Sequence, residues 1–426
     1  MHNSWRRGLS LARDVLFVSL GRYGQYVVTL ATVPLCARIL GVEGTGMLAI
    51  ATSAYFFGSI IVDFGLSQIL AGRVSREESA VSLRLSYAKL RLMLLAPLLL
   101  LCILAISLGW PPVAFMISIG LLAGGLSSAG EEWVLLGYGE FGRIAAYQVL
   151  ARCIYLASLF VALPLVQEPW TPMLCLAFST MVSAGFSWYR VGSIRTYNSP
   201  RIGITELVRV GSPAVGARML TSAYSQGATV YYSTVVPVAA LGVFSAGEKI
   251  VRAASAALDA LGLALLPRMA GALRKPTEFW SRAERSALGS FLFGCVAAAL
   301  MWIAAPLAVR ILYGPDFAAS IPILRWLVLL MPAAAVSSMI MTSVLYVRED
   351  SKGVLLGACI GVVAGAAGFT VTWIQAGSLT VMVASIVTLE WIVAGFYVSR
   401  LFRLKKRDIS PGDRASTNGH EEHKIT

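Results

Sequence analysis

The sequence predicts an all-α protein that crosses a membrane twelve times, with its helices in two pseudo-symmetric lobes of six around a central cavity. Three observations support this fold class: the composition, the spacing of apolar stretches and an internal duplication. Of the 426 residues, 57% are hydrophobic and only 13% are charged, and the mean hydropathy is +0.73. Soluble domains carry about 25% charged residues. So few charges could not cover a water-facing surface, which excludes a soluble enzyme and a disordered protein.

Twelve apolar stretches are long enough to span a bilayer, which takes about 20 residues in a helix. The first follows Trp5-Arg6-Arg7 and lacks the small-residue cleavage site of a signal peptide, so it is predicted to be an uncleaved helix. The predicted spans are 15–38, 46–70, 90–109, 112–136, 144–166, 170–190, 210–236, 242–267, 286–311, 320–346, 353–376 and 379–401.

The basic residues predict the orientation of these spans. Of the 35 Lys and Arg residues, 27 lie in or beside the loops and termini on one side, and two, Arg38 and Arg310, lie on the other. Cytoplasmic loops carry the excess of Lys and Arg, so both termini are expected in the cytoplasm. The net charge of +13 is thus explained by membrane topology, and no nucleic-acid partner is expected, because that would require basic residues on one solvated face.

An offset of 196 residues superimposes parts of the two halves of the chain. It places Arg22 on Arg218, Gly46 on Gly242 and Asp63 on Asp259. Charged residues inside spans are rare, so their coincidence carries more weight than that of aligned leucines. We therefore predict an N-terminal lobe at 1–192, a cytoplasmic linker at 193–209, a C-terminal lobe at 210–402 and a disordered cytoplasmic tail at 403–426.

Cysteine and histidine supply no catalytic or metal-binding pattern. The six cysteines lie inside apolar runs without a Cys-x-x-Cys pair, and the three histidines lie near the termini. We expect no catalytic residues, metal or cofactor.

Four charged residues in the predicted spans lie about 10 Å from the cytoplasmic ends of their helices, at 1.5 Å per residue. A charge at such a depth needs a partner, a water-filled cavity or a function. We predict ion pairs between Arg22 and Asp63 and between Arg218 and Asp259. A structural role and a role in transport stay open for these pairs. Glu131 and Glu132 are expected to be interface residues.

The span 242–267 carries a polar stripe whose members recur every three or four residues and so share one helical face. Arg252 lies near the midplane, where Glu248 can neutralise either Lys249 or Arg252 but not both. Arg152 either snorkels to the cytoplasmic interface or faces the cavity. Since Arg binds phosphate in bidentate fashion, a cationic cavity of this kind suits an anionic phosphate ligand. The stripe consists of Ser245, Glu248, Lys249, Arg252, Ser255 and Asp259.

Three segments resemble the polysaccharide (O-antigen) flippase family, the polysaccharide-transporter branch of the multidrug/oligosaccharidyl-lipid/polysaccharide exporter superfamily. In the third segment, Phe244 and Gly247 stand where the family usually has Tyr and Ala. The second segment matches the family's Trp-x(3)-Gly pattern and leads on to Ala145, Ala146 and Arg152. The segments are Pro34 to Gly41 with Gly46 and Asp63-Phe64-Gly65-Leu66, then Glu132-Trp133 to Gly137, and then Gly242 to Ile250 with Leu266-Pro267.

The resemblance implies a transporter of the bacterial inner membrane. It would move undecaprenyl-diphosphate-linked oligosaccharide from the cytoplasmic to the periplasmic leaflet by alternating access, for O-antigen, capsule or exopolysaccharide synthesis. It also implies a coupling ion, H+ or Na+, and polysaccharide polymerase and chain-length machinery as partners. Arg252, Lys249, Arg152, Arg22 and Arg218 are the expected substrate-binding residues. Asp63, Asp259 and Glu248 are the expected coupling residues or members of structural ion pairs.

Three alternatives stay open. A multidrug extruder of the same superfamily would expel cations and should carry unpaired carboxylates, whereas the charges that lack an obvious partner here are mostly Arg and Lys. A lipid II flippase usually has helices beyond twelve. A membrane polysaccharide polymerase or ligase, from a different class, would need a large periplasmic loop, and the predicted outer loops are short.

Overall fold

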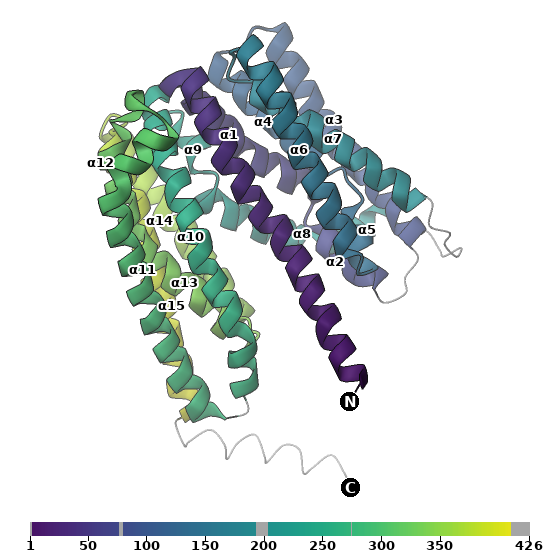
Figure 1. Cartoon of the computed structure of the whole chain (residues 1–426), viewed down its shortest axis with the longest axis vertical. Coiled ribbons are helices and arrows are strands. Elements are labelled where there is room, and N and C mark those ends of the chain that lie inside the picture. The colour runs from purple at the N-terminus through teal and green to yellow at the C-terminus, as the bar shows by residue number, and fades with distance from the viewer. Residues whose placement is uncertain (1, 76–79, 193–202, 274, 410–426) are drawn as a thin grey trace. The chain divides into compact units, whose positions relative to one another are not determined.

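The computed structural model describes residues 2–75, 80–192, 203–273 and 275–409, and within them every regular element is a helix (Figure 1). Helical segments cover each of the predicted spans. Helix α1 (His2–Asp63) contains the first predicted span and most of the second, and α15 (Leu379–Ile409) extends past residue 402 into the predicted tail. The segments 193–202 and 410–426, which include most of the predicted linker and tail, lie outside the described residues.

Eight helical segments of the described chain are long and apolar enough to cross a membrane. The total of twelve spans stays a prediction, because these eight do not include the predicted spans 15–38, 170–190, 210–236 and 242–267. The eight are Ala31–Asp63, Leu83–Ser107, Pro112–Gly137, Phe141–Leu165, Thr277–Leu312, Ser320–Leu345, Ser351–Ile374 and Leu379–Asp408.

Large apolar side chains lie on the surface of these helices. Leu92 is 69% exposed, Leu165 79%, Ile303 75% and Ile374 74%. A monomeric soluble protein rarely exposes large contiguous apolar patches, whereas lipid tails are as apolar as leucine. The chain is therefore a multi-pass membrane protein whose helices present these side chains to the bilayer.

The chain packs as two compact units. Unit 1 contains the residues up to Ala246 together with Val309–Ala318, and unit 2 contains Gly247–Ala308 and the residues from Ala319 on. This is a division by packing, whereas the predicted lobes 1–192 and 210–402 are a division by repeat, and those lobes stay a prediction.

Besides α1, the first unit holds four of the eight short helical elements that the structure describes. Its other elements are α2 (Leu66–Val74), α3 (Ala80–Ser107), α4 (Pro112–Ser127), α5 (Glu132–Gly137), α6 (Phe141–Leu165), α7 (Thr171–Gly192), α8 (Ile204–Ser225), α9 (Ala228–Tyr232), the first residues of α10 (Val238–Ala272) and the 3-10 turn η1 (Pro315–Phe317).

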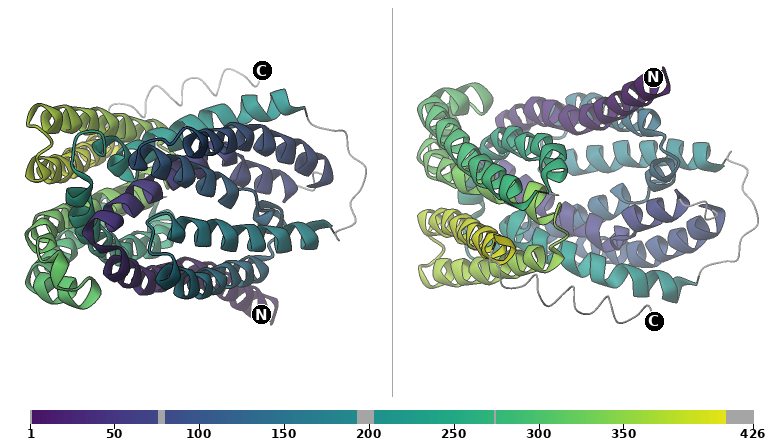
Figure 2. Two further views of the ribbon diagram at one scale, coloured as in Figure 1. Left: turned by 90° about the horizontal axis from the view of Figure 1, so that it is seen from above. Right: turned by 90° about the horizontal axis from the view of Figure 1, so that it is seen from below.

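The second unit holds the rest of α10 and most of α11, together with α15. In Figure 2, α14 and α15 lie side by side in both views. Its elements after α11 (Pro276–Leu312) are α12 (Ser320–Leu327), the 3-10 turn η2 (Val328–Leu330), α13 (Met331–Met339), the π-helical turn η3 (Ile340–Leu345) and α14 (Ser351–Ile374).

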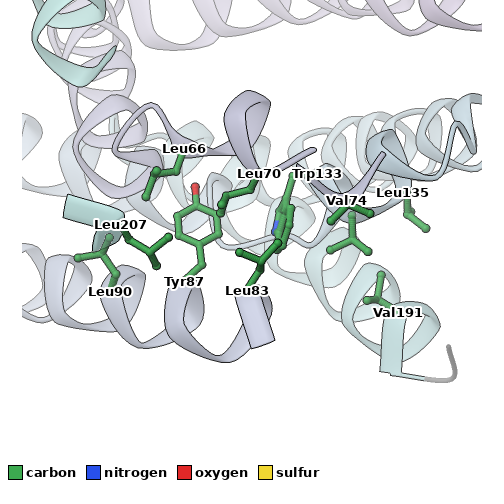
Figure 3. Close-up of a cluster of buried hydrophobic side chains, with 11 residues drawn as sticks. Leu66, Leu70, Val74, Leu83, Tyr87, Leu90, Trp133, Leu135, Val191 and Leu207 are labelled. Atoms are coloured by element: carbon green, nitrogen blue, oxygen red, sulfur yellow. The ribbon is translucent and has the colours of Figure 1, made fainter. Parts of the chain in front are cut away.

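Two apolar clusters form the core of unit 1. One lies where α2, α3 and α5 meet the ends of α7 and α8, with Tyr87 and Trp133 edge to face at its centre (Figure 3). The other joins α1 to α3, α4, α6 and α7 and contains Cys36, Cys102 and Cys175 as buried thiols. The first cluster consists of Leu66, Leu70, Val74, Leu83, Tyr87, Leu90, Trp133, Val134, Leu135, Val191 and Leu207.

Two glycines with positive φ interrupt the first helices. Gly41 has φ of 68° inside α1, and Gly65 has φ of 68° between α1 and α2. Residues with a side chain rarely adopt this left-handed conformation, so glycine is the residue that allows the chain to change direction there. Phe64, with φ of 50°, shares the second break. Asp63 thus ends a long helix at a sharp bend.

Gly46 and Gly242, the pair that the 196-residue offset superimposes, pack against each other's helices in unit 1. A Cβ on Gly46 would overlap the carbonyl oxygen of Val238, and a Cβ on Gly242 would overlap that of Val42. Val42 and Val238 are related by the same offset. A contact that repeats with the partners exchanged is what a two-fold relation produces. The duplication in the sequence therefore has a local counterpart in the packing of α1 against α10.

Glycines also bring the last two helices of unit 2 together. Gly353, Gly357, Gly361 and Gly365 recur every fourth residue of α14 and are buried. At Gly357 a Cβ would overlap the ring of Tyr397 on α15. Small residues at this spacing let membrane helices approach closely and gain van der Waals contact.

Candidate functional site

Asp63 at the end of α1 accepts hydrogen bonds on both carboxylate oxygens. Oδ1 accepts from the hydroxyl groups of Ser67 and Tyr87, the latter at 3.0 Å, and Oδ2 accepts from Nη1 of Arg218 at 2.7 Å. Asp63 is 7% exposed. Because the bend at Phe64 and Gly65 turns α2 back, Ser67 comes within reach of the carboxylate four residues earlier. The site is a buried carboxylate with a guanidinium on one side and two hydroxyl groups on the other.

The Asp63–Arg218 pair was not predicted from the sequence, and it joins the two halves of the repeat. We predicted that Asp63 pairs with Arg22 and that Arg218 pairs with Asp259, each pair within one half. The side chains of Arg22 and Asp259 lie outside the described residues, so those two pairs stay predictions. The Asp63–Arg218 contact follows from close packing of α8 on the bend: at Gly211 of α8 a Cβ would press on the ring of Phe64.

A second buried ionic cluster lies on α3 behind Asp63. Arg84 and Arg91 approach the Glu131 carboxylate to 3.5 and 3.9 Å. The Glu131 side chain is fully buried. The prediction that Glu131 is an interface residue is therefore wrong. The backbone N–H of Glu131 donates to Ser187 Oγ at 2.9 Å, which ties this loop to α7.

The two guanidiniums of this cluster also donate to backbone carbonyl groups at helix ends. Arg91 donates to the carbonyl oxygen of Gly130, beyond α4, at 2.9 Å, and Arg84 donates to that of Trp188, near the end of α7, at 3.1 Å. Cations near a helix C-terminus satisfy carbonyl groups that lack partners and complement the helix dipole. Glu131 balances one of these two buried charges.

The Asp63 site and the Glu131 cluster are connected through α3. Arg91 lies 3.7 Å from the centre of the Tyr87 ring and donates to Ser67 Oγ at 3.4 Å. Arg84, Tyr87 and Arg91 are spaced three and four residues apart, so they share one face of the helix. That spacing is a signal that could have identified them, but the sequence prediction had assigned Arg84 to a loop and Arg91 to the edge of a span.

Arg252 and Glu248, in the part of α10 that belongs to unit 2, form an ion pair one turn apart. Nε and Nη2 of Arg252 donate to Oε1 of Glu248 at 2.9 and 2.6 Å. The side chain of Arg252 is 44% exposed and that of Glu248 is 23% exposed. Lys249 is half-buried beside them. The pair with Glu248 offers a second explanation for Arg252, in which the arginine stabilises the helix locally and does not bind substrate.

Arg152 lies in α6 and is half-buried, close enough to Glu132 and Tyr155 for electrostatic interaction. Glu132, in α5, also accepts a hydrogen bond at 3.3 Å from Gln148, which lies in α6 like Arg152. Whether Arg152 binds substrate stays a prediction.

The motif residues Trp133, Phe244 and Gly247 pack in the interior. Trp133 is 3% exposed in the cluster of Figure 3, and Phe244 is 1% exposed. At Gly247 a Cβ would lie 3.3 Å from a methyl group of Leu327 and 3.4 Å from the backbone of Leu324, both in α12. Gly247 therefore packs directly against α12.

Unit 2 contains an ionic cluster that the sequence analysis missed. Arg400 grips Asp350 with two hydrogen bonds of 2.8 and 2.9 Å, and Arg348 grips Asp408 with two. Trp280 Nε1 also donates to Asp408, at 3.1 Å. These residues lie far apart in the sequence. Arg348 and Asp350 had been assigned to a short loop, Arg400 to the end of the last predicted span and Asp408 to the tail.

The Arg400 guanidinium beside Asp350 lowers the pKa of that carboxyl below its ordinary value. Asp350 also accepts from the backbone N–H of Gly353 at 3.1 Å and so caps α14. Both interactions favour the ionised carboxylate.

The fold is similar to those of two solved membrane proteins. The chain is similar to an inward-facing multidrug resistance transporter of the MATE family of the MOP superfamily, with 18% identity and a TM-score of 0.66 over 92% of this chain and 99% of that one. It is also similar to the lipid II flippase MurJ in an inward closed conformation, with 10% identity and a TM-score of 0.69 over 91% and 87%. At these identities the likeness concerns the fold.

The sequence itself shows the family. Residues 11–272 match the family described as polysaccharide biosynthesis protein, so the chain belongs to that family. Among curated proteins, none matches this sequence significantly. The suspected relation to the polysaccharide family is thereby confirmed.

Proposed function

We propose that this protein moves undecaprenyl-diphosphate-linked oligosaccharide from the cytoplasmic to the periplasmic leaflet of the bacterial inner membrane by alternating access. The polysaccharide family and the exporter fold support transport of a lipid-linked glycan. O-antigen, capsule or exopolysaccharide synthesis would use such a step. No bond of the substrate is made or broken in it, so the role proposed is that of a transporter.

The observation that carries the proposal is the exposure of two guanidinium groups on helices that cover predicted membrane spans. Arg218 of α8 and Arg252 of α10 keep 50% and 44% of their side-chain surface exposed, and each contacts a carboxylate. Both residues fall inside the region that matches the family. An exposed guanidinium on a helix within the bilayer needs water or an anionic ligand. A diphosphate offers oxygens in the geometry that the guanidinium fork matches.

The remaining predicted residues fit the same role. Lys249 and Arg152 would add positive charge, and Arg22 and Asp259 would be the repeat equivalents of Arg218 and Asp63. Coupling to H+ or Na+ and contact with polymerase or chain-length machinery are part of the proposal. The structural likeness to a MATE transporter makes a cation extruder the competing function.

Transport in proteoliposomes tests the proposal. A fluorescent undecaprenyl-diphosphate oligosaccharide is added to vesicles containing the purified protein, and an impermeant quencher measures how much glycan has crossed. Protein-dependent crossing is expected, while a cationic dye should not be moved. Movement of the dye without movement of the glycan lipid would favour the extruder and overturn the flippase. Formation of polymer from the added lipid would instead indicate a polymerase.

Reporter fusions test the orientation that the proposal requires. Fusions after residues 41, 110, 168, 239, 315 and 377 should be periplasmic, and fusions at 80, 200, 278 and 405 should be cytoplasmic, because Lys and Arg concentrate on the second side. A periplasmic signal at residue 200 would contradict the parallel repeat.

A further inference from the structure

The two oxygens of the Asp63 carboxylate accept from donors of different kinds, hydroxyl groups at Oδ1 and a guanidinium at Oδ2. This difference suggests a function for the site. We propose that Asp63 is an exchangeable counter-ion for Arg218, and that Tyr87 and Ser67 are positioning residues that hold the carboxylate while Arg218 turns to the diphosphate of the substrate. This inference rests on the proposed function.

The two members of the ion pair differ in how firmly the protein holds them. The side chain of Asp63 is 11% exposed, whereas that of Arg218 is 50% exposed. The described contacts use one of the five N–H donors of Arg218. Arg400 in unit 2, by comparison, is 20% exposed and grips its carboxylate through two nitrogens. Arg218 is therefore the more exposed partner, and within the described part of the chain it has N–H donors that no contact uses.

Asp63 keeps other partners when Arg218 leaves. Its Oδ1 oxygen accepts from Ser67 and Tyr87, and neither donor depends on the arginine. A buried carboxylate without any partner is strongly unfavourable. Since two hydroxyl groups already bind one oxygen, breaking the ion pair leaves a partly satisfied carboxylate in place of a bare one.

The hydroxyl groups are themselves held by a buried cation. The Arg91 guanidinium stacks on the Tyr87 ring and donates to Ser67 Oγ. Tyr87 is fully buried, and its single O–H is shared between the Asp63 carbonyl oxygen at 2.7 Å and Oδ1 at 3.0 Å, so the hydroxyl is fixed against Asp63. The positive charge behind the two hydroxyl groups stabilises the Asp63 carboxylate during the exchange. The arrangement thus has a fixed side, α1 to α3, and a movable side, α8.

The proposal predicts opposite effects on affinity from two neighbouring substitutions. Asp63→Asn keeps an acceptor for Tyr87 and Ser67 but removes the resident charge that competes for Arg218. Binding of undecaprenyl diphosphate should therefore tighten about 3- to 10-fold, as expected for loss of a charged competitor. Tyr87→Phe leaves Asp63 more dependent on Arg218, so binding should weaken by about the same factor, with Ser67→Ala as a second variant of this kind.

The experiment measures the dissociation constant of undecaprenyl diphosphate for the full-length protein in nanodiscs, normalised to folded protein, with undecaprenol as the uncharged reference. Tyr147→Phe is the matched control, because Tyr147 packs against the same apolar cluster and has no described bond to Asp63. It should leave the dissociation constant unchanged. In the Asp63→Asn background, Tyr87→Phe should lose its effect, since there is no longer a charge to hold.

Each result decides a different question. Weaker binding by Asp63→Asn, or a Tyr87→Phe effect that persists in the double variant, overturns the exchange and leaves the proposed function standing. Tighter binding that Arg218→Ala does not abolish overturns it as well, because Arg218 would not be the ligand. A wild-type protein that binds the diphosphate no better than undecaprenol overturns the proposed function and the exchange with it.

Discussion

The ionic clusters of the two units differ in how their charges are matched. In unit 2, each arginine of the cluster grips one carboxylate through two nitrogens, and the four side chains of the two pairs keep 13% to 25% of their surface exposed. In unit 1, Glu131 has no exposed surface and lies 3.5 and 3.9 Å from two guanidiniums that are also bonded to backbone carbonyls. Unit 2 thus contains bidentate ion pairs, here called clamps, that join helix ends. Unit 1 contains a cluster in which two guanidinium groups share one buried carboxylate, so positive charge is in excess.

This difference changes what each cluster can do. A bidentate pair in a partly hydrated position holds two segments together and has no charge left over. A carboxylate shared by two arginines leaves excess positive charge, and in unit 1 that charge stands behind the hydroxyl groups bound to Asp63. The comparison assigns stability to the clamps and preorganisation of Asp63 to the buried cluster.

The largest effect is expected from Glu131→Ala, which removes the carboxylate between two buried guanidiniums. Leaving buried charges unpaired should cost about 3–5 kcal/mol of stability. Membrane abundance and thermal unfolding in detergent measure it. Glu168→Ala, at an exposed carboxylate, should change stability by no more than about 0.5 kcal/mol. Equal abundance of the two variants would contradict the claim that Glu131 stabilises the protein by balancing buried positive charge.

An uncharged contact in unit 1 provides the next test, because it joins the halves of the repeat through backbone alone. Gly46→Ala should destabilise the protein by about 1–3 kcal/mol, since the new methyl overlaps the Val238 carbonyl and both helices must shift. Gly216→Ala in α8 meets no atom within 4 Å and should be neutral or stabilising. A Gly46→Ala protein as stable as the Gly216→Ala protein would contradict the close approach.

A smaller effect is expected at the Asp350–Arg400 clamp. Asp350→Asn should cost about 1–2 kcal/mol at neutral pH, in the range for a hydrogen-bonded charged group in a partly hydrated site. The pKa of Asp350 is lowered in the folded protein, so its contribution is present above the unfolded value of about 3.9 and is lost as pH falls through the folded value.

Unfolding measured against pH checks this sign. The gap between wild type and Asp350→Asn should narrow in acid below the ordinary Asp pKa and stay constant from pH 5 to 8. A gap that widens in acid would mean that the pair is not stabilised by ionised Asp350.

The smallest effect on stability is expected at Arg252 and Glu248. An exposed pair one helical turn apart contributes about 0.3–0.5 kcal/mol. Arg252→Ala should therefore leave the protein in the membrane while nearly abolishing glycan transport, and Arg252→Lys should impair transport partially because it loses the planar fork. Surface glycan and protein level are measured together. Glu248→Ala that is as harmful as Arg252→Ala, with both proteins reduced in amount, would identify a structural pair.

Much of the fold could be predicted from the sequence, because the bilayer restricts the choices. Backbone polar groups in lipid must bond internally, so long apolar runs become helices and their positions can be read from hydropathy. The predicted ranges for α4 with α5, α6, α14 and α15 agree with the structure to within a few residues, except where α15 continues to Ile409. Gly46 and Gly242, which the repeat superimposes, also take equivalent places in a helix contact, and that contact was not predicted from the sequence.

The charged pairs could not be predicted in the same way. Depth along a helix placed Asp63 and Arg218 at similar levels, but depth does not say which helices touch. The bend at Phe64 and Gly65 and the packing of α8 on it bring Arg218 to Asp63. Glu131 was assigned to an interface because it follows an apolar run, and only the folding of α3 across that loop buries it.

The sequence by itself determined that this chain is a helical membrane protein of the polysaccharide family with cationic residues on its helices. The tertiary structure alone decided which charges are matched and which keep exposed surface. The physical reason is that membrane insertion depends on hydrophobicity summed along each segment, whereas an ion pair depends on a contact of about 3 Å between segments far apart in the chain. That contact is set by glycine-mediated approach of helices and by bends, which hydropathy does not record.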